Sequence, residues 1–238
     1  MAKRIDPKAD RKRKLEDLKR QQRAKERRKT LVTVGLATFA GLALIAAVVV
    51  PAVLKDRKNA GARKAATAEA KKPLADFGVK AAAAGCGEDK VASPLPPGSG
   101  HVAEGQRVDY KAIPPDGGQH TGTATVAIGE GFYPRSGQAP AEHAVHSLEH
   151  GVVIGWYDKT LPADQVTALQ QAGASAAQKK LRFIAVPWER ANFADSKPFV
   201  LTSWGHTQRC GKVSGEVIDA FVKKNADSKD APERNGRV

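Results

Sequence analysis

The chain has 238 residues, with 39 Lys and Arg against 25 Asp and Glu, which gives a formal net charge of +14. This excess is confined to the N-terminal third, because residues 1–30 carry 14 basic and 5 acidic side chains, residues 55–72 carry 7 and 2, and residues 73–238 carry 18 of each. A nucleic-acid-binding domain is expected to carry its basic excess on the folded part of the chain. We therefore predict no nucleic-acid partner.

The N-terminal part predicts a membrane anchor. Residues 1–30 form a basic cytoplasmic segment, and residues 31–54 contain 24 amino acids without a charged side chain. A helix with a rise of about 1.5 Å per residue crosses a hydrocarbon core of roughly 30 Å over that length. The basic flank favours a cytoplasmic N-terminus. We predict an uncleaved signal anchor in the cell membrane, a single pass through the lipid bilayer and an extracytoplasmic C-terminal domain.

The remaining chain divides into three parts by composition. Residues 55–85 are rich in Ala and Lys and predict a linker. Residues 86–224 contain all three Trp and all three Tyr and predict one extracytoplasmic domain. Residues 225–238 lack apolar periodicity and predict a disordered tail.

Strand and helix patterns within residues 86–224 predict an α+β fold, with a small, mostly antiparallel sheet and two or three helices. Alternating or continuous apolar residues predict strands at residues 106–113, 152–157, 181–188 and 198–205. Helical periodicity predicts helices at residues 139–150, 161–180 and 214–224, with Ser214 as an N-cap. A loop rich in Gly and Pro precedes the first helix.

The two cysteines, Cys86 and Cys210, lie at the two ends of this domain and outside any C-x-x-C motif. Their placement predicts a disulfide. A bridge that closes a loop of about 120 residues stabilises a fold by roughly 4–5 kcal/mol in chain-entropy terms. Disulfides belong to oxidising compartments, which agrees with the predicted topology. The alternative is a pair of unconnected buried thiols.

Histidines are concentrated in one short stretch, "HAVHSLEHG" at residues 143–151. His146 and His150 are one helical turn apart and can share a cation, because side chains at i and i+4 point the same way. We predict them as primary metal ligands, with His120 and His101 as additional ligands and Glu149 as a ligand or an orienting group. Met1 is the one methionine, so nitrogen and oxygen ligands for Cu(II) or Zn(II) are expected.

Two other interpretations of the cluster stay open. His146, Glu149 and His150 also spell H-x-x-E-H, the motif of inverted zinc peptidases. That function requires a substantial helix and a distant third ligand, for which Glu216 is the candidate, whereas Gly151 ends the helix directly after the motif. The second alternative is a structural or partner-binding envelope module whose polar cluster braces loops. We favour a protein that is not an enzyme.

Several segments resemble a bacterial membrane-anchored family known as domain of unknown function 3105. They include "HVAEGQRVDYKAIPPDGGQH", "GFYPRSGQAP" and "VHSLEHGVVIGWYD", and the similarity runs from His101 to Glu233. The resemblance implies an anchor and an external domain without an established activity. The family's loop reads Pro-Pro-Thr-Ser-Gly-Pro-His, whereas this chain lacks the Thr-Ser pair. The shared positions are His101, His120, His146, Glu149 and His150, while His143 and His206 fall outside the family pattern.

Overall fold

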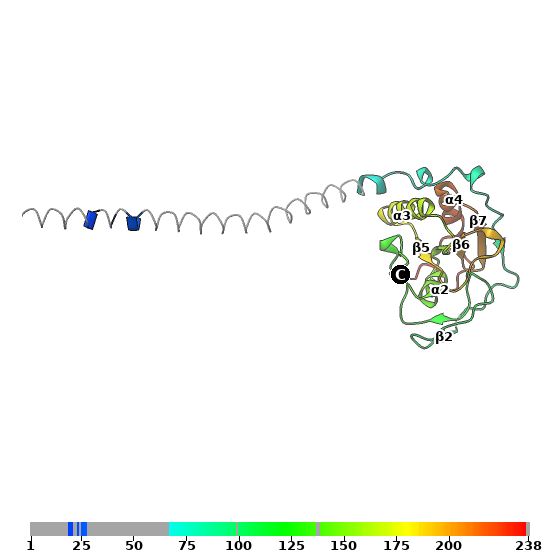
Figure 1. Ribbon diagram of the computed structural model, residues 1–238. Helices are drawn as coiled ribbons and strands as arrows, with labels where there is room; N and C mark the ends of the chain where they lie inside the picture. The colour runs from blue at the N-terminus through cyan, green and yellow to red at the C-terminus, as the bar shows by residue number, and fades with distance from the viewer. Residues whose placement is uncertain are drawn as a thin grey trace, which may run out of the picture. The chain divides into compact units, whose positions relative to one another are not determined.

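The computed structural model describes residues 19–20, 23, 25–27, 67–98, 100–136 and 139–236. The chain separates into two compact units, Met1–Lys64 and Ala65–Val238, and the second holds the folded domain (Figure 1). Within the described ranges, no helix has both the length and the apolar character that a membrane span requires. The predicted transmembrane helix at residues 31–54 lies outside these ranges.

A five-stranded sheet forms the centre of the domain, in the order β1-β7-β6-β4-β5. The pairs β1–β7, β7–β6 and β6–β4 are antiparallel, and β4–β5 is parallel, so the predicted mostly antiparallel sheet and mixed α+β class are confirmed. The strands are β1 (Lys90–Val91), β4 (Val153–Tyr157), β5 (Phe183–Pro187), β6 (Phe199–Ser203) and β7 (His206–Cys210).

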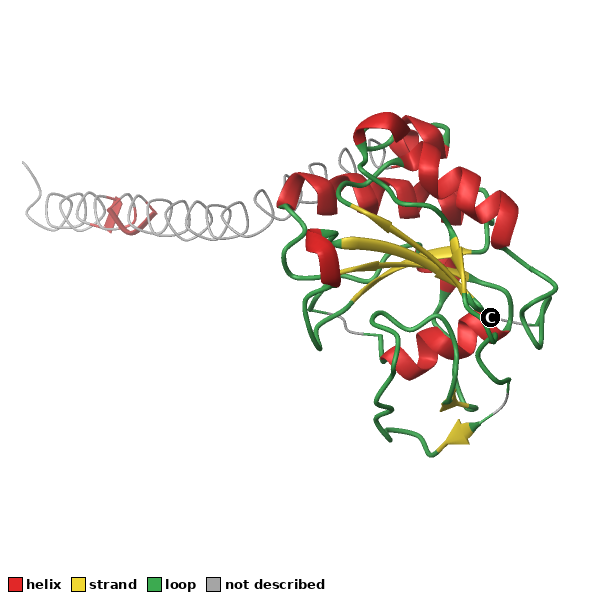
Figure 2. Ribbon diagram, turned by 90° about the vertical axis from the view of Figure 1, so that its right-hand side faces the viewer, coloured by secondary structure: helices red, strands yellow, loops and turns green. Residues whose placement is uncertain are grey.

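Helices cover both faces of this sheet, as Figure 2 shows. Side chains alternate between the faces of a strand, so Val153 and Tyr157 of β4 pack on one side and Ile154 and Trp156 on the other. The first side is covered by α3 (Ala163–Gln178) and α4 (Gly215–Asn225), and the second by α2 (Ala141–Glu149). The short 3-10 helices are η1 (Leu74–Asp76), η2 (Ala81–Ala83), η3 (Ile128–Glu130) and η4 (Ala194–Ser196).

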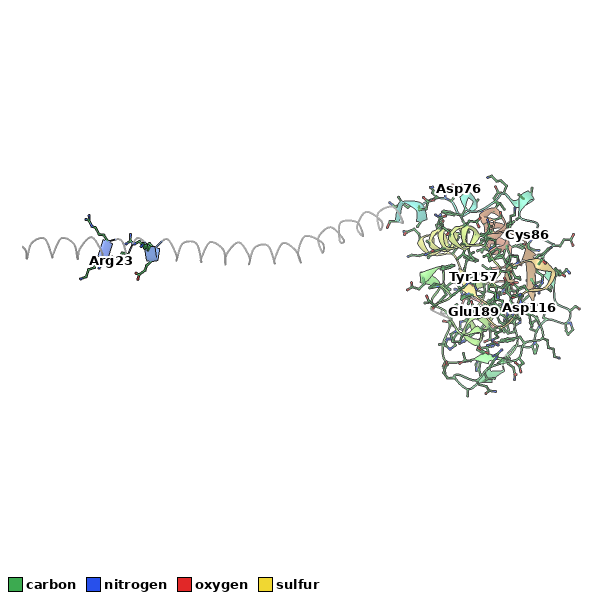
Figure 3. All side chains as sticks on the ribbon, viewed as in Figure 1. Arg23, Asp76, Cys86, Asp116, Tyr157 and Glu189 are labelled. Atoms are coloured by element: carbon green, nitrogen blue, oxygen red, sulfur yellow. A yellow bond between two sulfur atoms is a disulfide. The ribbon has the colours of Figure 1, made fainter. Side chains whose placement is uncertain are left out.

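The predicted disulfide is confirmed. The sulfur atoms of Cys86 and Cys210 are 2.02 Å apart, and the bridge spans 124 positions of sequence. Cys210 is the last residue of β7 and is fully buried, whereas Cys86, labelled in Figure 3, belongs to the segment that precedes β1. The bridge therefore fastens the N-terminal segment of the domain to the sheet.

One predicted strand is absent, and several observed strands were not predicted, β7 among them. The prediction of a strand at residues 106–113 is wrong, because this segment is an irregular loop in which side chains bind both backbone groups of Val108. Val108 donates its N–H to Glu142 at 2.8 Å, and its carbonyl accepts from Arg190 at 2.7 Å. Of the strands that were missed, β7 reads HTQRC, and such a polar sequence gives no apolar alternation. It forms because Gly205, at φ 73°, lets the chain turn back from β6.

The folded domain extends beyond the predicted boundaries 86 and 224 at both ends. Leu74 and Phe77, which the sequence assigns to the linker, are 3 % exposed and belong to the core beneath α4. Residues 226–236, expected in a disordered tail, run across the end of α2. Ala231 is buried there, and the N–H of Glu233 donates to the carbonyl of Glu149 at 3.0 Å.

We expect the substitution Ser214→Ala to lower the free energy of unfolding by about 1 kcal/mol. The hydroxyl of Ser214 accepts the N–H of Val217 in the first turn of α4, so alanine would leave that donor without its cap. Urea unfolding of Ala65–Val238 measures the change. Ser136→Ala, an exposed turn position, is the matched control, and equal midpoints for the two variants would contradict the capping role.

Candidate metal centre

Two very short strands place two histidines side by side. β2 (His101–Val102) and β3 (His120–Thr121) pair in parallel, with His101 opposite His120 in the register. Residues opposite each other on neighbouring strands point to the same face of a sheet. The two imidazole rings accordingly lie with their centroids 5.0 Å apart. His120 is completely buried, whereas His101 is exposed and gives the cluster an opening to solvent.

The helix α2 supplies the other half of the cluster. It begins after Pro140, whose fixed φ suits a helix start, and ends where Gly151 adopts φ 87°. His146 and Glu149 are three positions apart and so project from one face, toward β3. Both side chains are nearly inaccessible, with residue exposures of 8 % and 1 %.

The cluster brings together four side chains of the types that bind metal ions. One ligand atom from each of His101, His120, His146 and Glu149 lies within 4.8 Å of all the others. His120 and His146 stack with ring centroids 5.1 Å apart, and Nε2 of His120 is 2.8 Å from Oε2 of Glu149. Two atoms that both lie about 2.0–2.2 Å from one zinc ion are at most about 4.4 Å apart, so metal binding would draw these ligand atoms slightly closer together.

Hydrogen bonds on the outer side of the rings fix which nitrogen faces the centre. Nδ1 of His120 contacts the carbonyl of Gly118 at 2.8 Å, and Nδ1 of His146 contacts the carbonyl of Ala124 at 3.0 Å. A carbonyl only accepts, so each Nδ1 donates, and each ring turns its Nε2 toward the centre of the cluster. Metal-binding histidines are oriented in this manner by backbone carbonyls.

The electrostatics of the cluster favour ligands in their metal-binding protonation state. Burial lowers the pKa of His146 below its usual value, so this ring stays neutral at neutral pH. Nε2 of His120 and Oε2 of Glu149 lie 2.8 Å apart, and both atoms are buried. A cation in contact with both atoms would be stabilised by the carboxylate.

Comparison with known proteins identifies the family of this domain. Residues 101–237 match the family model described as "Protein of unknown function (DUF3105)". The chain belongs to this family. The match covers β2, β3 and α2, and therefore all four residues of the cluster. No curated protein and no solved structure matches the chain.

The DUF3105 domain brings together four of the five predicted ligands but arranges them differently from the prediction. His101, predicted as an additional ligand, belongs to the four-residue cluster, whereas His150, predicted as a primary one, does not. His150 follows the last residue of α2 and lies in a second group with Glu149 and Glu233. Glu233 was given no role from the sequence, because residues 225–238 contain no metal-binding motif and were expected to be disordered.

Other polar residues of the DUF3105 domain have partners elsewhere. His143 contacts Glu104 at 2.8 Å, and His206 lies between Asp89 at 3.4 Å and Asp230 at 3.1 Å. Glu216 of α4 was the candidate third ligand of a peptidase. Its Oε1 instead pairs with Nζ of Lys80 at 2.9 Å. None of these three residues belongs to a metal-compatible group in the described part of the chain.

We expect Gly122→Ala to weaken any metal binding by the cluster about 10–100-fold, the range seen when groups that orient metal ligands are lost. A Cβ at Gly122 would lie 2.8 Å from Nδ1 of His101 and 2.9 Å from its Cγ, so the ring must move. Zinc titration against a chromophoric chelator measures the affinity.

Gly129→Ala is the matched control, because a Cβ there meets no atom within 4 Å. An unchanged affinity in the Gly122→Ala variant, with both variants folded, would show that the position of the His101 ring is immaterial.

Proposed function

We propose that this domain binds a divalent metal ion through His101, His120, His146 and Glu149. The observation that supports this most directly is the convergence of four ligand atoms within 4.8 Å in a largely buried cluster. The contacts of Nδ1 of His120 and His146 with backbone carbonyls add to it, because they turn both Nε2 atoms inward.

The ligand set points to Zn(II) or Cu(II). Both cysteines are consumed in the disulfide, and Met1 is the one methionine, so soft sulfur ligands are not offered. Three imidazoles with one carboxylate suit borderline ions, of which zinc accepts this set in a four-coordinate arrangement. The proposed role is binding of the ion at the cell surface, without catalysis.

A metallohydrolase is the second candidate, and an open cavity in the same part of the domain argues against it. This open cavity of about 560 Å³ is lined by Thr121 and His143, which are chain neighbours of the ligands, together with Trp188 and Arg190. The four ligand residues are not among its lining residues. A metal ion that activates water for hydrolysis must face its substrate, and α2 is also only 9 residues long.

A structural envelope module without a metal is the third candidate. The Nδ1 bonds of His120 and His146 to loop carbonyls would then brace the loops against α2. A protonated His120 ring would add an ion pair between Nε2 and Oε2 of Glu149, which lie 2.8 Å apart. Metal titration distinguishes this bracing role from metal binding.

We further propose that the domain is held outside the cytoplasm by a single-pass anchor at residues 31–54. The apolar run, its basic flank and a disulfide suited to an oxidising compartment support this location. A domain held in this location could also bind a protein partner in the envelope. An alkaline phosphatase domain fused after Val238 should be active in cells, and an inactive, cytosolic fusion would refute the topology.

Metal titration of the full chain tests the proposed function. The protein is purified without a histidine tag, stripped with chelator and titrated with Zn(II) and Cu(II), and bound metal is counted by mass spectrometry. We expect binding below micromolar concentration that His146→Ala abolishes. His143→Ala is the matched control, one turn earlier on α2 and outside the cluster. Absence of binding at micromolar metal, or equal binding by both variants, would refute the proposal.

A further inference from the structure

Glu149 belongs to two groups of metal-compatible side chains. The first is the four-residue cluster, and the second consists of Glu149, His150 and Glu233, whose ligand atoms also lie within 4.8 Å of one another. His146 of the first group and His150 of the second are near neighbours, with ring centroids 4.7 Å apart. The carboxylate of Glu149 therefore stands between two adjacent sets of ligand atoms.

The C-terminal tail is fastened so that Glu233 faces the end of α2. The N–H of Glu233 donates to the carbonyl of Glu149 at 3.0 Å, which fixes the backbone at this point. Arg182 pairs with Asp227 at 2.8 Å and donates to the carbonyl of Gly236 at 3.1 Å, so it fastens the tail on both sides of Glu233. The Glu233 side chain is therefore held near His150.

The ring of His150 is not held as a structural histidine usually is. Its Nδ1 is buried and makes no hydrogen bond. Its Nε2 lies 3.4 Å from Oε2 of Glu233, beyond the usual range of an N–H···O hydrogen bond. Polar side-chain atoms in protein interiors are normally satisfied, so a mostly buried imidazole placed between two carboxylates without close bonds is suited to a cation.

We infer that this domain holds two divalent ions, with Glu149 as the bridging carboxylate and with His150 and Glu233 completing the second site. This inference rests on the proposed function, since the bridge has no meaning without the first ion. The charge distribution supports it. The first group offers three imidazoles and one carboxylate, and Glu233 adds a further carboxylate beside His150 for a second dication. Two oxygen ligands and one nitrogen leave the second ion coordination positions open to water.

The number of ions bound per chain tests the inference. Native mass spectrometry of the full chain in detergent, without a histidine tag and with Zn(II) added, should show two ions in the wild type. Glu233→Gln and His150→Ala should each bind one ion, with the affinity of the remaining site changed less than tenfold. Glu130→Gln, an exposed acidic position outside both groups, is the matched control and should bind two.

The possible outcomes separate this inference from the proposed function. One ion in the wild type and one in each variant would leave the first site standing and overturn the second. Two ions in both Glu233→Gln and His150→Ala would place the second ion elsewhere and also overturn the inference. No ion in the wild type would remove the proposed function itself. With Cu(II), two bridged ions should give a spin-coupled electron paramagnetic resonance spectrum, which reverts to that of an isolated ion in Glu233→Gln.

Discussion

Removal of the Cys86–Cys210 bridge is expected to lower the free energy of unfolding by about 4–5 kcal/mol. The bridge spans 124 positions, so the reduced unfolded chain gains far more conformational freedom than a short loop would give it. Small domains are stable by about 5–15 kcal/mol, so the loss is a large fraction of the total. The segment around η1 would also lose its covalent link to β7.

Denaturant unfolding of Ala65–Val238, with and without a thiol reductant, measures this effect. The double variant Cys86→Ala, Cys210→Ala is the control, because the reductant must leave its unfolding midpoint unchanged. A difference of less than about 1 kcal/mol in the free energy of unfolding between the oxidised and reduced forms would contradict the expectation. It would show that the reduced unfolded chain keeps enough structure to make the bridge redundant.

The parts of the fold that the sequence predicted are those where local pattern and burial agree. β4, β5 and β6 were predicted because both faces of each strand are buried, which requires continuous apolar residues. β7 was not, since three of its five residues are only partly buried and tolerate polar side chains. The tail from Ala226 was missed for a related reason, because backbone bonds and ion pairs hold it more than apolar area does.

In the candidate site, the spacing of residues along the sequence predicted one pair of neighbours but not the composition of the cluster. Helical spacing correctly placed His146 and His150 near each other, with ring centroids 4.7 Å apart. However, α2 ends at Glu149, and His150 therefore turns toward Glu233 instead of the cluster. His101 enters the cluster through a parallel pairing of β2 with β3, a contact between distant residues that no local pattern reports.

Glu149→Gln is expected to remove most of the stability that zinc gives to the domain. An ion that binds only the folded state adds about 4.1 kcal/mol at a concentration 1,000-fold above its dissociation constant. Loss of a coordinating carboxylate should weaken binding at least about 100-fold, because even outer partners of metal ligands contribute about 10–100-fold. At the same zinc concentration the gain should then fall to about 1.4 kcal/mol. Urea unfolding of Ala65–Val238, with and without zinc, measures both gains.

Glu142→Gln is a closely matched control for this substitution. Glu142 lies on the same helix and is 6 % exposed, but it pairs with Arg190 at 2.6 Å, away from the cluster. Loss of that pair should lower stability with and without zinc by the same amount, so the gain from zinc should remain as in the wild type. If the cluster only braces loops, zinc should stabilise neither the wild type nor either variant. The difference between Glu149→Gln and Glu142→Gln in the zinc-dependent gain therefore distinguishes a ligand from a buried carboxylate with a structural role.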